Sequence, residues 1–204
     1  MLRLVGSCTL LAVLTLLVGC GATRNPAHYL KHYRCSEPTV EEFTVCRKAG
    51  CRELSTLGYT PAEWQSITAI FEPAPESPDE ERERLRIAIA AMEQIIGEKN
   101  GTHVDRPRNR REGDNHGAQL DCIAEATNTT VALTLFQNNG ILRYHTAGYP
   151  QHRGFIHGRL PHNTAIILEN ETGDAYAIDS WFHANGELPE VVTLAEWKAG
   201  FSPN

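Results

Sequence analysis

The N-terminal half of the chain carries two amphipathic helical patterns. Each begins with a capping residue followed by proline, at Thr60-Pro61 and Ser77-Pro78, and each has a glutamate close behind. A cap with proline at the first helical position is typical of a helix N-terminus. Apolar side chains then recur three or four residues apart, which places them on one helix face. We therefore expect helices over 61–71 and 78–96.

Two shorter signals lie in the same half. The run from Thr39 to Glu42 resembles a capping box and Gly50 is a suitable end residue, so a short helix is expected between them. The charge run 80–84 mixes acidic and basic residues at the start of the second long helix. Its spacing favours ion pairs between residues four apart, and we interpret the run as a solvated face.

The C-terminal half combines one helix with strands. Residues 123–137 have helical periodicity, and Asn139-Gly140 follows as a stop signal. The runs 141–145, 162–169 and 175–179 are rich in aliphatic, aromatic and β-branched residues, as strands are. The predicted fold class is therefore α+β, with a helical N-terminal half and a C-terminal antiparallel sheet.

The last two strands form a predicted hairpin with a geometric consequence. If the turn centres near residue 171, His162 at the start of one strand faces Asp179 at the end of the other, within a residue or two of register. A hydrogen bond from the imidazole to the carboxylate would fix the tautomer and stabilise the imidazolium.

The first residues of the chain resemble a sorting signal. Arg3 is followed by an apolar run from Leu4 to Val18, which is shorter than the roughly 20 residues of a membrane span. The run ends in a sequence that resembles a bacterial lipobox, with Cys20 at the cleavage position. The resemblance implies a lipid anchor on Cys20, and Gly21 after it favours the outer membrane over inner-membrane retention. An ordinary cleaved signal peptide is the alternative.

Composition and charge further narrow the class of protein to which the chain can belong. The 204 residues include 41% hydrophobic and 22% charged side chains, which suits one globular domain and argues against disorder. The formal net charge is −6, so no basic footprint indicates a nucleic-acid partner.

The remaining cysteines divide into two groups. Cys35, Cys46 and Cys51 lie close together in the sequence, and we expect one disulfide among them and one thiol left over. Cys122 comes directly before the 123–137 helix. The dipole at a helix N-terminus favours the thiolate, which is the nucleophilic form. A buried structural cysteine, or a disulfide with the leftover thiol, is the alternative for Cys122.

A cysteine opening a helix, a histidine opening a strand and an aspartate ending the next strand resemble the transglutaminase-like superfamily. The resemblance covers roughly residues 115–204 and implies a papain-like core. It makes Cys122 the nucleophile, His162 the general base and acid, and Asp179 the residue that orients the histidine. In this chain Asn163 follows the histidine where many members have an aromatic residue.

The implied reaction is acyl transfer on an amide or isopeptide bond. Hydrolysis is favoured over crosslinking because water is the default acceptor. The oxyanion hole would combine the backbone N–H of Cys122 with a side-chain donor, for which Gln119 and His116 are candidates. Trp181 would either shield the His–Asp pair from water or serve as a core aromatic.

The expected organisation follows from these assignments. A lipoprotein signal peptide covers 1–19 and a lipidated tether 20–34, and a single α+β domain covers 35–204. Within that domain 35–100 is a helical subregion and 115–204 the catalytic core. The expected partners are the membrane, through the lipid anchor, and a peptide, protein or other amide-containing substrate of the cell envelope.

Two alternatives stay open. Six of the nine histidines lie between residues 116 and 183, which leaves a zinc site conceivable. No HExxH or similar helical spacing occurs, so we expect no metal and no other cofactor. A non-catalytic binding or scaffold lipoprotein with the same fold is the second alternative.

Overall fold

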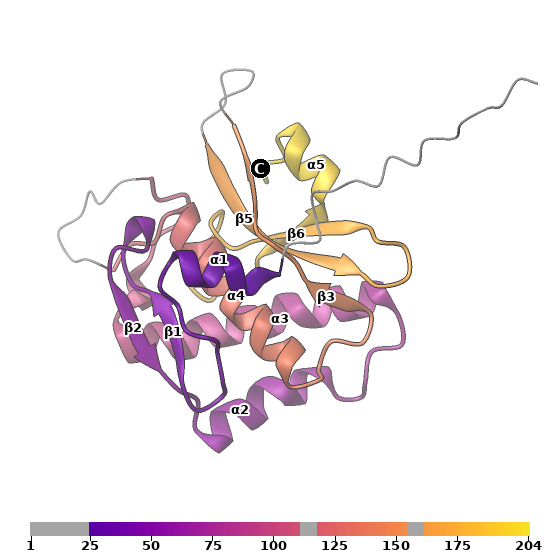
Figure 1. The fold of residues 1–204 in the computed structure, drawn as a ribbon, viewed down its shortest axis with the longest axis horizontal. Coiled ribbons are helices and arrows are strands. Elements are labelled where there is room, and N and C mark those ends of the chain that lie inside the picture. The colour runs from indigo at the N-terminus through magenta and orange to yellow at the C-terminus, as the bar shows by residue number, and fades with distance from the viewer. Residues whose placement is uncertain (1–24, 111–117, 155–160) are drawn as a thin grey trace, which may run out of the picture.

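The computed structural model describes residues 25–110, 118–154 and 161–204, so the signal peptide and lipidation assignments lie outside the described residues. The fold is α+β, with helices in the N-terminal half and a five-stranded antiparallel sheet in the C-terminal part (Figure 1). None of the helices in the described ranges is both long and apolar enough to cross a bilayer.

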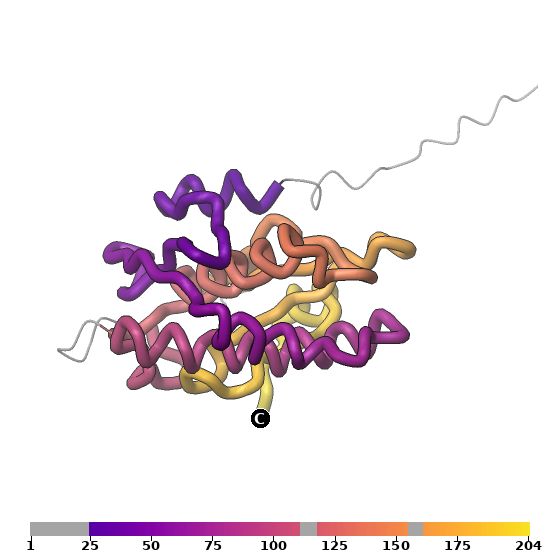
Figure 2. The backbone as a smooth tube through the Cα atoms, turned by 90° about the horizontal axis from the view of Figure 1, so that it is seen from below, coloured from indigo at the N-terminus to yellow at the C-terminus, as the bar shows by residue number. Residues whose placement is uncertain are grey.

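Helix α4 (Cys122–Asn138) occupies the centre of the molecule (Figure 1). It is buried along nearly its whole length because small and apolar residues cover all of its sides. One side contacts α1 (Pro26–His32) and β1 (Phe43–Cys46), and another contacts β5 (His162–Glu169). Figure 2 shows α1 as an outer layer over α4.

The sheet has the strand order β3-β5-β6-β7, and β4 also pairs with β5. Its remaining strands are β3 (His145–Ala147), β4 (Gln151–Arg153), β6 (Ala175–Asp179) and β7 (Glu190–Thr193). The bounds of β5 and β6 are the predicted ones, whereas the predicted strand 141–145 begins later, at His145. We did not predict β4 and β7.

In the observed β5–β6 register, Asp179 lies opposite a residue two positions away from its predicted partner, His162. Ala165 pairs with Ile178, so continuing the ladder places Asp179 opposite Thr164. His162 is therefore a diagonal neighbour of Asp179 on the same face of the sheet rather than its direct partner. Diagonal neighbours still lie within reach of aromatic and long side chains, which is why the two residues meet.

The two long helices of the N-terminal half begin where the sequence indicates. Thr60 completes a capping box at α2 (Pro61–Thr68), which continues as the short helix η2 (Ala69–Phe71), and Ser77 caps α3 (Pro78–Asn100). The predicted end of α3 at Gly97 is wrong. Gly97 packs against His103 of η3 (Thr102–Val104), where an added Cβ would lie 2.8 Å from a backbone nitrogen.

The predicted short helix between Thr39 and Gly50 is also wrong. This segment forms β1, which pairs with β2 (Leu54–Leu57), because Phe43 and Val45 are strand formers that fill the core. The Thr39 hydroxyl instead closes a turn with Glu42. Helix α1 lies within the segment 20–34 that we expected to be a tether, and its Tyr29 and Leu30 are buried. The last helix, α5 (Leu194–Ala199), was not predicted.

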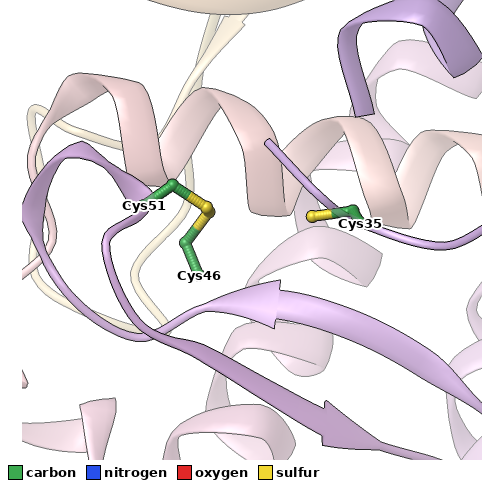
Figure 3. Close-up of side chains that lie close together, drawn as sticks. All are labelled: Cys35, Cys46 and Cys51. Carbon is green, nitrogen blue, oxygen red and sulfur yellow. A yellow bond between two sulfur atoms is a disulfide. The ribbon is translucent and has the colours of Figure 1, made fainter. Parts of the chain in front are cut away.

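Three cysteines lie together beside α4 (Figure 3). Cys46 and Cys51, the latter at the end of η1 (Ala49–Cys51), form a disulfide, and Cys35 is a free thiol, so the expected pairing of one disulfide and one leftover thiol is confirmed. Burial raises the pKa of Cys35 to about 11, which keeps it protonated at neutral pH. Asn128 of α4 bonds both the backbone N–H and the carbonyl of Cys46, at 2.7 and 3.0 Å.

The charge run at the start of α3 is only partly the solvated face that we expected. One of its residues is buried and anchors a distant backbone segment. Arg84 and Glu80 form the expected surface pair. Glu81, however, has no exposed surface and accepts hydrogen bonds from the backbone N–H groups of Arg143, Tyr144 and His145 and from the His145 ring. These hydrogen bonds outweigh desolvation and lower the pKa of Glu81.

Glu81→Ala tests this anchor. Removing the carboxylate leaves three backbone donors and a histidine without their acceptor, so we expect the free energy of unfolding to fall by about 3–5 kcal/mol in urea denaturation at pH 7. Because the pKa of Glu81 is lowered in the folded state, the loss should shrink as the pH falls through that pKa. The matched control Glu83→Ala removes a half-exposed carboxylate two residues away, and an equal loss in both variants would contradict the anchor.

Candidate active site

The structure brings Cys122, His162 and Asp179 together at one end of α4. Cys122 is the first residue of the helix, His162 opens β5, and Asp179 ends β6. The Nε2 atom of His162 lies 2.6 Å from Oδ2 of Asp179, and both side chains are almost fully buried. Each of the three groups is thus placed by the start or end of a regular element, which fixes its position more closely than a loop would.

Trp197 of α5 completes the arrangement around the carboxylate. Its indole N–H donates to the same Oδ2 of Asp179 at 2.7 Å, and the side chain is completely buried. Two donors from different elements therefore hold one carboxylate oxygen. The sequence analysis missed this residue because it did not assign α5, although the capping box of Thr193 and Glu196 marks the start of that helix.

Aromatic rings enclose the imidazole. The ring centroid of His162 lies 4.5 Å from that of Trp181, 5.4 Å from Phe182 and 5.5 Å from Trp197. Trp181 is buried and its indole N–H donates to the carbonyl of Asn109. Trp181 therefore packs directly against the histidine and takes up space that water would otherwise occupy.

The electrostatics of His162 favour the imidazolium. Burial by itself lowers the pKa of a histidine, but the hydrogen bond to Asp179 and the interaction with Cys122 outweigh it and raise the pKa of His162. Since Nε2 is bound to Asp179, Nδ1 is the ring nitrogen left for Cys122. Nδ1 is buried and has no hydrogen-bond partner among the described residues.

The start of α4 determines where the thiol lies. Asp121 caps the helix, and its Oδ1 accepts from Ala124 N at 3.0 Å and from Gly50 N at 2.8 Å. The backbone N–H of Cys122 belongs to the first helical turn, whose donors have no acceptor within the helix. Such donors point out of the helix end and favour negative charge there.

Asn163 is a site residue that the sequence reasoning did not assign. Its Nδ2 lies 3.6 Å from the Cys122 sulfur. Simple strand alternation predicts opposite faces for His162 and Asn163, yet both line the same pocket because β5 begins here, at the edge of the ladder. The asparagine at a position where the resemblance led us to expect an aromatic residue was the signal that could have identified it.

Of the two predicted oxyanion donors, the structure describes Gln119 alone, and its amide is engaged away from the thiol. The Gln119 amide donates to the carbonyl of Val104 and accepts from Arg106 N, and Gln119 is not among the described residues that line the pocket beside Cys122. His116 lies outside the described residues.

A pocket of about 510 Å³ opens beside the thiol. Cys122, His162 and Asn163 line one part of it, and aromatic and arginine side chains line the rest. This volume is typical of sites for small molecules or short peptide segments. The described pocket residues are Arg108, Asn109, Arg110, Asp121, Cys122, Ile123, Arg153, Pro161, His162, Asn163, Trp181, Phe182, Gly200, Phe201 and Ser202.

Three of the described histidines contact carboxylates, and the described histidines form no common metal-ligating centre. His145 contacts Glu81, His162 contacts Asp179, and His183 lies 2.8 Å from Glu190. Within the described ranges, the one group of three metal-ligating side chains is the cysteine cluster, and two of its sulfurs form the disulfide.

Three carboxyl groups are buried behind the first turn of α4. Burial raises the pKa of Glu93 to about 7 and that of Asp105 to about 6. Burial and the nearby acidic groups of Glu93, Asp105 and Asp179 raise the pKa of Glu125, on α4, well above the usual range. Asp105 accepts from Leu120 N at 2.7 Å, so the cluster also holds the segment that leads into the helix.

Comparisons of the chain with protein-family models, with curated proteins and with solved structures gave no match. The site is therefore characterised by its own geometry and chemistry.

The buried acids predict that stability falls with rising pH. Their raised folded-state pKa values mean that the native state binds more protons than the unfolded state. Their stabilising contribution is complete at low pH and is lost as the pH rises through about 6 to 7. Each additional proton bound by the native state makes the free energy of unfolding fall by up to about 1.4 kcal/mol per pH unit.

Glu125→Gln should flatten this dependence. The amide keeps a hydrogen-bonding group and carries no charge, so the melting temperature should fall less between pH 5 and pH 8 than in the wild type. Glu37→Gln, at an exposed position, serves as the control and should keep the wild-type slope. If the melting temperature changes equally with pH in the wild type, Glu125→Gln and Glu37→Gln, the proposed titration of the buried acids is refuted.

Proposed function

We propose that this protein is a cysteine-dependent hydrolase or acyltransferase that acts on an amide or isopeptide bond. The observation that carries the proposal is the buried His162–Asp179 hydrogen bond next to a cysteine at a helix N-terminus. A nucleophile, a base and a group that orients the base are the parts required for thiol catalysis.

The proposed reaction begins at the sulfur of Cys122. His162 Nδ1 takes the thiol proton, and the thiolate attacks the carbonyl carbon to form a C–S bond. The carbonyl oxygen gains negative charge, which the backbone N–H of Cys122 and the Asn163 amide are placed to stabilise. His162 then returns its proton to the amide nitrogen, the C–N bond breaks, and a thioester remains on Cys122.

The second half of the reaction releases the acyl group. His162 takes a proton from water, the water oxygen attacks the thioester carbon, and the C–S bond breaks. The products are a carboxylic acid and the regenerated thiol. An amine in place of water would give transamidation, and hydrolysis is the proposed default because the pocket opens to solvent. Asp179 keeps Nε2 protonated throughout, so that Nδ1 is the atom that exchanges protons.

The proposal extends to fold family and location. The order of Cys122, His162 and Asp179 along the chain supports a papain-like core of the transglutaminase-like type. The apolar run ending at Cys20 supports a lipid-anchored protein of the cell envelope, on the periplasmic face of the outer membrane.

The nucleophile can be tested with iodoacetamide at pH 6. His162 is the base that takes the thiol proton in the proposed reaction, so Cys122 should be alkylated roughly 10²-fold faster in the wild type than in His162→Ala. The alkylation rate of Cys122 in Asp179→Asn should lie between the rates in the wild type and in His162→Ala. Mass spectrometry of the labelled peptide separates Cys122 from Cys35, which is buried and should react slowly in all variants.

Turnover requires a second measurement. Incubation with envelope peptides should give a thioester adduct on Cys122 and released amine, both abolished in Cys122→Ala. Two negative results would together identify a non-catalytic binding or scaffold protein. Cys122 of the wild type would react with iodoacetamide no faster than Cys122 of His162→Ala, and no thioester adduct would form.

A further inference from the structure

The pocket beside Cys122 is cationic although the chain as a whole is acidic. The net charge of the chain is −6, yet three arginines, Arg108, Arg110 and Arg153, line this pocket. Asp121 is the one acidic residue among the described pocket residues, and its Oδ1 is engaged in capping α4. The start of α4 and the imidazolium of His162 add further positive potential to the same space.

Aromatic rings hold the arginines in place. The guanidinium carbon of Arg153 lies 4.4 Å from the Trp197 ring centroid, that of Arg110 lies 5.5 Å from Trp181, and that of Arg108 lies 5.6 Å from Phe182. Stacking of this kind preorganises a guanidinium, so that less conformational entropy is lost when it binds a ligand.

Two of these arginines have no carboxylate partner among the described residues. Arg108 donates to the carbonyl of Pro203 at 2.7 Å, and no ion pair joins Arg108 or Arg110 to a described acid. The arginines of α3 are different, because Arg82, Arg84 and Arg86 each pair with a glutamate or aspartate. Guanidinium groups that line a pocket are a usual means of recognising carboxylates.

We propose that the pocket selects amides that carry a free carboxylate close to the scissile carbonyl, and that Arg108 and Arg110 bind this carboxylate. The proposal rests on the proposed function for the position of the scissile bond. The chemical class comprises acidic peptides, with the carboxylate at a chain end or on a side chain. Neutral amides of the same size lack the ionic contact and should bind more weakly.

A pair of alkylating reagents tests the selection directly. Iodoacetate and iodoacetamide transfer nearly the same group to a thiolate, with a C–S bond formed and iodide released, but iodoacetate carries a carboxylate. We expect the ratio of the iodoacetate rate to the iodoacetamide rate at Cys122 to exceed the ratio for glutathione. In Arg108→Gln/Arg110→Gln this ratio should fall about tenfold.

The ratio is the informative quantity because a lost positive charge also changes the reactivity of the thiolate towards both reagents. Lys31→Gln, which removes one positive charge at an exposed position of α1, should keep the wild-type ratio. The wild-type ratio should also fall as salt is raised, since ionic attraction is screened. A wild-type ratio equal to that of glutathione would overturn the proposal and leave the nucleophile intact.

A binding measurement separates this proposal from the catalytic one. In Cys122→Ser no thiol chemistry is possible at this position, and the fluorescence of Trp181 reports on pocket occupancy. Glutarate should bind this variant more tightly than glutaramide, its uncharged analogue, and the difference should vanish in the triple variant that also carries the two arginine substitutions. Equal affinity for the two ligands would refute carboxylate selection even if Cys122 proves catalytic. Selective glutarate binding with an unreactive Cys122 would uphold the carboxylate site and refute the proposed reaction.

Discussion

The candidate site depends on how the first turn of α4 is held. Asp121 Oδ1 accepts one hydrogen bond from within the helix and one from Gly50, in the loop closed by the Cys46–Cys51 disulfide. The side chain of Asn128, almost two turns further along α4, accepts a hydrogen bond from the backbone N–H of Cys46 and donates one to its carbonyl. The N-terminal half of the chain thereby sets the position of Cys122. A helix end that could shift by even an ångström would lose the alignment between sulfur and imidazole on which thiol chemistry relies.

The other half of the site is set by the sheet. The β5–β6 ladder makes His162 and Asp179 diagonal neighbours, and helix α5 then adds Trp197 to the same carboxylate oxygen. Elements that are far apart in the chain therefore meet at one carboxylate. With its buried Oδ2 satisfied by two donors, Asp179 stays in place as a hydrogen-bond acceptor, and the histidine has one orientation that satisfies its own N–H.

The sequence predicted those features whose causes are local. Helix starts at Pro61 and Pro78 follow from capping chemistry, and β5 and β6 follow from apolar runs around a polar turn. The strand β1 was missed because capping-like residues precede it, and tertiary packing of its apolar side chains decided its conformation. Glu81 was misjudged because its acceptor role depends on backbone donors more than 60 residues away.

The same distinction applies to the site itself. Chain order and hairpin geometry were enough to indicate Cys122, His162 and Asp179, since each lies at the end of a predictable element. Asn163 and the pocket arginines were not identified as site residues, because their role depends on how the end of β5, the 105–110 segment and the C-terminal residues come together around the thiol. The periodicity of the sequence does not indicate that these segments lie next to one another in the fold.

The buried acids and the cationic pocket both lie near the first turn of α4. Glu125 lies one turn after Cys122, and with Glu93 and Asp105 it would place three negative charges behind the thiol if all were ionised. Such charges would cancel the positive potential at the start of α4 and disfavour the thiolate. Burial reduces this effect by raising the pKa of all three groups, so that they keep their protons to a higher pH than exposed carboxyl groups do. The low-dielectric core around these acids therefore limits the loss of the positive potential that the proposed nucleophile and a carboxylate-bearing substrate would use.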